Sequence, residues 1–234
     1  MTRRRYLTEG LVIVVSILLA FGIEAAWAEF SEAREAYRLL ESIRDDVEAP
    51  QVEVAARQTR SEELSDRARH LLSTLADPPS DEVLRDALLT LGSILIIRGW
   101  EPVTHSYDEA VNSGRLRLIE SESLRLALTR YNAGVKEVDM VHRQAATQYY
   151  GQLEPFMVEH TVYSEIGAEW WRGALVEAPF TTDFAALATN REMWNLVTLR
   201  LELEVTLLTL LGRMDALAVE VLGLLNDELG PGAS

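Results

Sequence analysis

The sequence has no cysteine among its 234 residues. This absence excludes disulfide bonds, thiolate metal sites and cysteine nucleophiles together. It does not identify the redox compartment, because a helical chain of this length can bury a core without covalent cross-links. Glycine and proline are few, at 13 and 7 residues, whereas leucine, alanine, glutamate and arginine dominate. That balance favours helix over strand and predicts an all-α fold.

Sequence signatures of catalysis are also absent. The chain lacks the nucleotide-binding patterns G-x-x-x-x-G-K-[ST] and G-x-G-x-x-G, the hydrolase pattern G-x-S-x-G and the metalloprotease pattern H-E-x-x-H. It also lacks the paired Glu-x-x-His motifs of di-iron bundles. The four histidines, His70, His105, His142 and His160, are dispersed, and chance explains their neighbouring acids. The sequence therefore predicts no enzymatic activity, no metal and no cofactor.

Positive charge is scarce, and Lys136 is the only lysine. The formal net charge is −15; the first 28 residues carry +1, so the remainder carries −16. A domain this acidic repels nucleic acid and anionic lipid alike, which predicts no nucleic-acid partner. A basic soluble partner and plain solubility are the two interpretations of the acidic surface.

One long apolar run stands near the N-terminus. Residues 1–10 are basic, and Leu11–Ile23 is apolar apart from Ser16. Counted from Tyr6 to Trp27, the segment has 22 residues. At about 1.5 Å per residue it covers roughly 33 Å, close to the thickness of a bilayer core. The pattern predicts a transmembrane anchor, with Tyr6 and Trp27 at the two membrane interfaces.

The same segment also resembles a signal peptide, because Ala26-Trp27-Ala28 is an A-x-A cleavage pattern. The helical pattern favours the uncleaved anchor, since no helix breaker occurs before Ala49-Pro50. Three arginines precede the run and acidic residues follow it. The positive-inside rule therefore predicts a bacterial inner-membrane protein with a cytoplasmic N-terminus and a periplasmic domain.

Small residues recur four apart within the run, at Ser16 and Ala20 and at Gly22 and Ala26. This spacing lets two helix backbones approach closely in a membrane. The alternative is simple exposure to lipid. The expected partners are accordingly the lipid bilayer and other membrane protein subunits.

Beyond the anchor, at residues 1–28, the pattern predicts one acidic helical domain at 29–234, a bundle with long antiparallel helices. Prolines, glycines and capping residues divide it. The expected helices are Gln51–Ala76, Asp81–Ile97 capped by Ser80, Thr104–Ser113 closed by Gly114, a long helix from Ser121 or Ser123 to about Gln152, and a last helix from Asp183 or Asn190 to about Asp227.

The segment at about 155–182 loses helical periodicity and gathers aromatic residues. It either folds over the core or forms a surface that meets a partner or the membrane interface. The candidate contacts are Phe156, Tyr163, Trp170, Trp171 and Phe180.

In the last helix, apolar residues recur at a mean spacing near 3.5, which predicts the seam of an intramolecular bundle or of a homo-oligomeric coiled coil. The predicted seam is Leu196, Leu199, Leu203, Leu207, Leu210, Met214, Leu217, Val221 and Leu224.

Several short motifs together resemble an uncharacterised domain-of-unknown-function family of bacterial proteins with one N-terminal membrane span and a helical extracytoplasmic region. The resemblance covers about the first 135 residues and departs after the span, where relatives often have Asn or Gln and this chain has Glu24-Ala25-Ala26. It implies a topology and supplies no activity. The residues that carry it are Glu9, Leu11–Ile23, Trp27, Glu29, Tyr107, Ser113-Gly114, Leu118-Ile119, Leu124-Arg125 and Tyr131.

These observations lead to three functional hypotheses. The first is a non-enzymatic accessory or structural subunit that packs against a larger membrane complex; respiratory and photosynthetic reaction-centre or light-harvesting assemblies are typical hosts. The second is a periplasmic sensory or ligand-binding module with a pocket under Pro155–Thr182, and the third is an enzyme. The missing motifs favour the first over the third.

Overall fold

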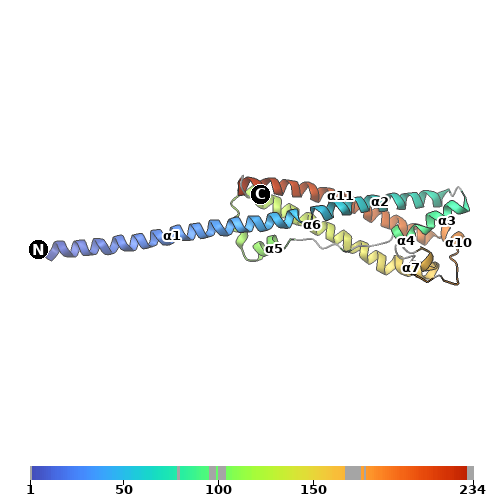
Figure 1. The fold of residues 1–234 in the computed structure, drawn as a ribbon, viewed down its shortest axis with the longest axis horizontal. Helices are drawn as coiled ribbons and strands as arrows, with labels where there is room; N and C mark the ends of the chain where they lie inside the picture. Colours follow the sequence, from blue (N-terminus) through green and yellow to red (C-terminus); the bar gives the residue numbers. More distant parts are fainter. Residues whose placement is uncertain are drawn as a thin grey trace. The chain divides into compact units, whose positions relative to one another are not determined.

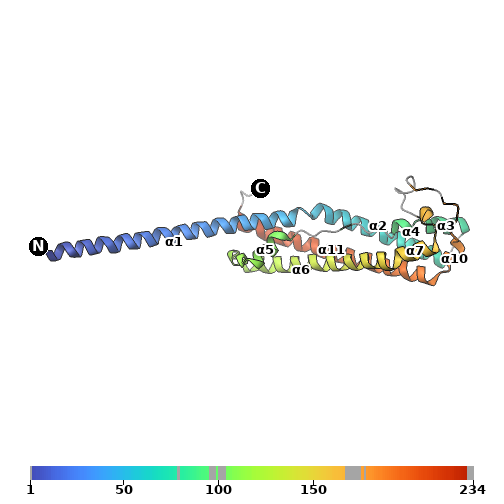
Figure 2. The same ribbon diagram turned by 90° about the horizontal axis from the view of Figure 1, so that it is seen from below.

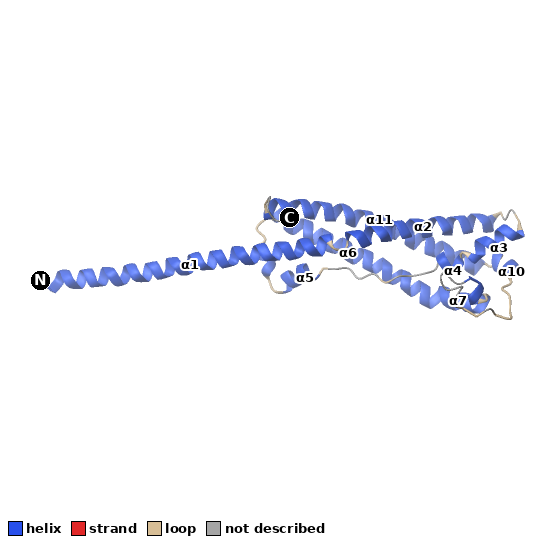
Figure 3. Ribbon diagram, viewed as in Figure 1, coloured by secondary structure: helices blue, strands red, loops and turns tan. Residues whose placement is uncertain are grey.

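The computed structural model of the chain describes residues 2–77, 80–94, 99, 104–166, 175–176 and 178–230, with side chains of the first helix described from Val15 onward. The chain divides into two compact units. Unit 1 comprises Met1–Val47, Thr104–Leu128 and Val221–Ser234; unit 2 comprises Glu48–Val103 and Thr129–Glu220. Within the described residues every regular element is a helix and none is a strand (Figure 3). The predicted all-α fold with long helices is confirmed.

Helix α1 runs without a break from Thr2 to Glu48, over 47 residues (Figure 1). It passes through residue 28, the predicted boundary between anchor and domain, as one continuous helix. It ends just before Pro50, which has no N–H to continue the helical hydrogen bonds. The predicted continuity between the apolar run and the first helix of the domain is therefore confirmed.

Unit 1 combines the C-terminal half of α1 with α5 (His105–Asn112), η1 (Arg115–Leu118), the start of α6 (Glu122–Gln148) and the end of α11 (Arg191–Leu229). Gly114 separates α5 from η1 with φ of 73°, a left-handed conformation that glycine adopts without strain, as expected of a helix-ending residue. The buried apolar residues of unit 1 are Leu39, Leu40, Ile43, Val47, Ala110, Leu118, Ile119, Leu124, Ala127, Leu128, Val221 and Leu225.

The N-terminus of α5 is capped from α1 and not by the predicted Thr104. The carboxylate of Asp46 accepts a hydrogen bond from the backbone N–H of Ser106, at 2.6 Å. The Thr104 hydroxyl instead donates to the side chain of Asp108, at 2.9 Å. A carboxylate suits this position better than a hydroxyl, because the helix dipole attracts negative charge to a helix N-terminus.

Unit 2 begins with α2, which spans Gln51–Ala76 as predicted. Helix α3 (Asp81–Leu89) follows and is capped by Ser80, whose Oγ accepts the N–H of Val83 at 3.2 Å. This hydrogen bond satisfies one of the backbone donors that the first turn of a helix leaves without a partner. The predicted cap is confirmed.

The predicted helix Asp81–Ile97 is interrupted at Thr90, and α4 (Leu91–Ile94) follows the interruption. Both the hydroxyl and the backbone N–H of Thr90 donate to the carbonyl of Ala87, three residues back. Such local bonding by a β-branched residue competes with the regular helical ladder. The prediction of one continuous helix was therefore wrong, and residues 95–97 lie outside the described part.

The chain stays helical past Gln152, where the sequence predicts an end. A π-helical turn, η2 (Tyr149–Leu153), joins α6 to α7 (Glu154–His160), and the N–H of Glu154 reaches back five residues to the carbonyl of Tyr149. Pro155 would clash within a regular α-helix, but at the first turn after η2 its missing N–H costs nothing. The expected irregular conformation from residue 155 was therefore wrong for α7.

Helix α8 (Tyr163–Ile166) adds a second helical turn to the aromatic segment. Helix α10 (Phe184–Ala188) then begins after Asp183, whose carboxylate accepts the N–H of Ala186. The following α11 begins after Asn190, whose side chain accepts two backbone N–H groups of the first turn. Both predicted starting points are therefore used, each by its own helix.

Helices α6 and α11 run antiparallel within unit 2 (Figure 2). Arg130 forms an ion pair with Glu220 at 3.5 Å, and the amide of Gln148 donates to the carbonyl of Leu196 at 3.3 Å. The later residue of α6 therefore contacts the earlier residue of α11, as expected for antiparallel helices. The buried hydrophobic cluster of this unit is Ala68, Leu71, Ala87, Leu88, Leu91, Ile94, Leu153, Phe156, Met157, Ile166, Leu187, Met193, Leu196 and Val197.

The buried seam of α11 lies one residue away from most of the predicted seam. Leu199, for example, is 44% exposed, whereas Arg200 is fully buried. The spacing alternates between four and three, the heptad pattern of a packed helical bundle. Of the predicted seam, four residues are buried as expected: Leu196, Leu207, Met214 and Val221. The other five each lie one residue before a buried position, because two apolar stripes lie side by side on α11: Leu199, Leu203, Leu210, Leu217 and Leu224. The seam is Met193, Val197, Arg200, Glu204, Leu207, Leu211, Met214, Ala218, Val221 and Leu225.

Candidate functional site

The predicted anchor and the residues just after it leave their large apolar side chains exposed. Their exposed fractions lie between 49% and 70%. Successive residues of a helix turn by about 100°, so these positions cover all sides of α1, and a helix that is apolar all round is normally buried. The exposed residues are Val15, Ile17, Leu18, Leu19, Phe21, Ile23, Trp27 and Phe30.

The small residues predicted to pack against other helices lie in the same part of α1. Ser16, Ala20, Gly22 and Ala26 are exposed. A Cβ added at Gly22 would meet nothing within 4 Å. Tyr6 belongs to α1, but its side chain lies outside the described part. Among the described residues, no helix is both long and apolar enough to cross a bilayer.

The predicted aromatic contacts divide between core and surface. Phe156 is buried in the hydrophobic cluster of unit 2. Tyr163 is 40% exposed, with its hydroxyl 3.4 Å from that of Tyr149, and Phe180 is 72% exposed. Trp170 and Trp171 lie outside the described residues.

A cluster of charged side chains is buried where the seam of α11 faces α2. Arg200 and Glu204 are 0% and 1% exposed, and their side chains form an ion pair at 2.7 Å. From α2, the hydroxyl of Ser61 donates to Glu204 at 2.7 Å, and Arg57 approaches the same carboxylate at 3.9 Å. Two buried cations therefore share one buried anion.

Burial dominates the electrostatics of this cluster. It lowers the pKa of Arg57 and of Arg200, and the charge of Glu204 offsets part of each change. It also lowers the pKa of His142 on α6, and the positive charge of Arg57 adds to that effect. A buried ion pair contributes little net stability, because desolvation opposes the attraction, but removing one partner leaves an uncompensated charge. The arrangement is that of a structural polar layer within a bundle.

This cluster was not predicted from the sequence. Charged residues are rarely buried, and the predicted seam of the last helix contains apolar residues only. The signal that identifies them is spacing, because Met193, Val197, Leu207 and Leu211 continue the same four-three alternation on both sides.

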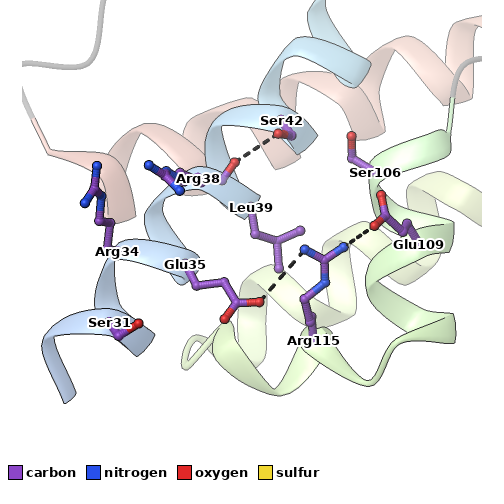
Figure 4. A pocket seen from close by; sticks show the side chains of 9 residues that line it. All are labelled: Ser31, Arg34, Glu35, Arg38, Leu39, Ser42, Ser106, Glu109 and Arg115. Carbon is purple, nitrogen blue, oxygen red and sulfur yellow. Dashed lines mark hydrogen bonds and ion pairs between the residues drawn. The ribbon is translucent and has the colours of Figure 1, made fainter. Parts of the chain in front are cut away.

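A second polar site is an open cavity of about 490 Å³ within unit 1. Figure 4 shows Arg115 of η1 reaching toward α1, where it pairs with Glu35 at 3.9 Å, and toward α5, where it pairs with Glu109. The guanidinium groups of Arg34 and Arg38 form no ion pair with any residue that the structure describes. The lining residues are Ser31, Arg34, Glu35, Arg38, Leu39, Ser42, Ser106, Glu109 and Arg115.

Comparison with known proteins adds no assignment. No family model, curated protein or solved structure matches the chain. The resemblance to a single-span family therefore stays a prediction. In the described part of the chain, no three histidine or acidic side chains are placed to hold a metal ion.

Proposed function

We propose that this chain is a membrane-anchored, non-enzymatic accessory or structural subunit of a larger membrane protein complex. The proposal places the N-terminal half of α1 in the bacterial inner membrane and the acidic helical region in the periplasm. Other membrane subunits and the lipid bilayer are its expected partners.

The main observation that supports this proposal is the exposed apolar surface of α1 between Val15 and Phe30. Soluble monomers rarely expose a contiguous apolar patch of more than a few hundred Å², and this one surrounds the helix. Lipid or the apolar face of another span is the environment that matches it. In the sequence, the apolar run also extends toward the N-terminus, to Leu11.

Continuity of α1 supports a docking role for the anchor. Buried residues on α1, such as Ile43 and Val47, belong to unit 1. The same helix carries the exposed apolar surface without a proline or other break between them. A partner that holds the apolar part of α1 therefore constrains the core of unit 1 as well.

Fractionation and native purification of the full-length protein test the two parts of this proposal. The protein is expected to remain in the membrane after alkaline carbonate washing, and protease added to spheroplasts is expected to digest residues 30–234. Extraction by carbonate, or full protection in spheroplasts, would contradict the anchor and its orientation.

Gentle detergent purification from native membranes is expected to recover other membrane subunits, and a free monomer would contradict the accessory role.

A ligand-binding module is the second candidate, and the cavity in unit 1 favours it. This cavity is lined by α1, α5 and η1, and not by residues 155–182, under which the sequence analysis placed a pocket. Ligand binding at this place is compatible with the anchor, because α1 lines the cavity and carries the apolar surface.

A further inference from the structure

The cavity in unit 1 has a local charge that differs in sign from the chain as a whole. Its lining includes three arginines and two glutamates, whereas the chain carries −15. Both glutamates, Glu35 and Glu109, pair with Arg115. The positive charge of Arg34 and Arg38 is therefore not neutralised by an ion pair within the described residues.

A second acid of α1 near these arginines is also paired. Glu32 pairs with Arg117 of η1 at 3.3 Å. Arg115 and Arg117 of one short helix thus pair with two glutamates of α1, Glu32 and Glu35. This pairing lowers the local repulsion that an anion would meet on its way to Arg34 and Arg38.

The lining chemistry suits a phosphate group. Arg34 and Arg38 stand four residues apart on α1, so their guanidinium groups lie on one face of the helix (Figure 4). Guanidinium groups donate paired hydrogen bonds to phosphate oxygens. Ser31 and Ser106 add hydroxyl groups to the lining, and hydroxyls also donate to phosphate.

The position of the cavity along α1 indicates where such a phosphate would come from. At about 1.5 Å per residue, Ser31 lies about 6 Å, Arg34 about 10 Å and Arg38 about 16 Å beyond Trp27 along the helix axis. Headgroups extend about 5 to 8 Å beyond each side of the hydrocarbon core. The side chain of Arg34 is long enough to bridge the remaining few ångströms to the headgroups, and Arg38 stands one helical turn farther along α1.

We propose that this cavity binds the phosphate of a phospholipid headgroup, through Arg34 and Arg38. The inference rests on the proposed anchor, because only an inserted α1 brings the cavity to the membrane surface. The acidic remainder of the chain repels anionic lipids at long range. A zwitterionic phospholipid such as phosphatidylethanolamine therefore fits best.

The test counts lipids retained by the full-length protein. The protein is reconstituted in nanodiscs of phosphatidylethanolamine mixed with a glycosyl diacylglycerol, which has no phosphate, and native mass spectrometry measures the ratio of the two retained lipids. We expect the phospholipid to be enriched. The double variant Arg34→Ala/Arg38→Ala is expected to lower this ratio about tenfold, since it removes charge-assisted hydrogen bonds to phosphate.

The matched control is Arg67→Ala/Arg69→Ala, which removes two exposed arginines from α2 and is expected to keep the wild-type ratio. An unchanged ratio in Arg34→Ala/Arg38→Ala would overturn the proposal. Displacement of the lipid by millimolar inorganic phosphate or glycerophosphoethanolamine would identify free phosphate as the ligand and overturn the headgroup as its source. Carbonate washing of each variant reports insertion separately, so a failed anchor is distinguishable from a failed lipid site.

Discussion

Two regions of this molecule reverse the usual placement of side chains. Between Val15 and Phe30, α1 exposes large apolar side chains, whereas unit 2 buries Arg57, Arg200 and Glu204. Folded domains normally bury the first kind and expose the second. The two departures have different consequences, because the apolar surface needs an apolar environment from outside the chain, whereas the buried charges lie beside one another within unit 2.

The stability of the exposed region depends on its surroundings. The stability of the buried cluster depends on all of its charged residues being present. Apolar surface in water is unfavourable by roughly 25 cal/mol per Å², so the exposed part of α1 favours transfer into lipid or onto another span. The buried ion pairs add little net stability, but removal of one charged residue leaves the others uncompensated. Substitutions in α1 should therefore change location, and substitutions in the cluster should change folding.

The largest expected effect is on membrane insertion. In Leu18→Lys/Leu19→Lys, each lysine at the centre of a span costs about 2.5 to 3.5 kcal/mol. The protein is expected to leave the carbonate-resistant membrane fraction. The control Leu126→Lys/Val219→Lys changes two exposed apolar residues of the helical domain and is expected to stay in that fraction. If both variants stayed in the membrane fraction, or both left it, the apolar surface of α1 would not be what holds the protein in the membrane.

The next effect concerns the buried cluster. Glu204→Ala leaves two buried arginines without their carboxylate, and the free energy of unfolding is expected to fall by about 3 to 5 kcal/mol. Urea unfolding measures this change. The neighbour Glu202 is exposed on the same helix, and Glu202→Ala is expected to change stability by less than about 0.5 kcal/mol. If the two variants lose the same small amount, Glu204 does not hold the cluster together.

What the sequence predicts well in this molecule is local, and what it misses depends on distant residues. Ser80, Asp183 and Asn190 cap helices where they were expected to, because capping needs only the next three residues. The seam of α11 was misplaced in part, because the burial of Glu204 depends on α2, whose Arg57 and Ser61 contact it.

The cavity shows the same limit. Arg34 and Arg38 are separated in sequence from Arg115 by the whole of α2, α3, α4 and α5. No spacing rule connects them, since helix periodicity relates only residues of one helix. The exposed apolar run of α1, in contrast, was found from sequence because its signal is continuous along the chain.

Replacing the whole cluster should have a smaller effect of opposite sign. In Arg57→Met/Ser61→Ala/Arg200→Met/Glu204→Leu no buried charge of this group remains to be desolvated, and apolar side chains of similar length fill the space. Stability in urea is expected to be unchanged or higher by about 1 to 4 kcal/mol. A loss as large as that of Glu204→Ala would show that the ionised cluster itself stabilises the fold. The variant's m-value checks that unfolding remains cooperative.

The smallest effect is a pH dependence from His142. Burial, followed by the charges of Arg57 and Arg200, lowers the pKa of His142 in the folded chain, while Asp139 and Glu204 act in the opposite direction. The unfolded chain therefore takes up a proton near pH 6.5 that the folded chain does not. Stability is fully present above that pH and falls as the pH drops toward the folded pKa.

For one proton the slope is at most about 1.4 kcal/mol per pH unit. Urea unfolding between pH 7.5 and 5.5 measures it, above the range where most carboxylates titrate. His142→Gln keeps a polar side chain without the titration and is expected to flatten the slope. His70→Gln, at an exposed position of α2, is expected to keep the wild-type slope. If His142→Gln keeps that slope as well, protonation of His142 does not cause the pH dependence of stability. The buried cluster then differs from exposed α1 through its arginines and Glu204 alone.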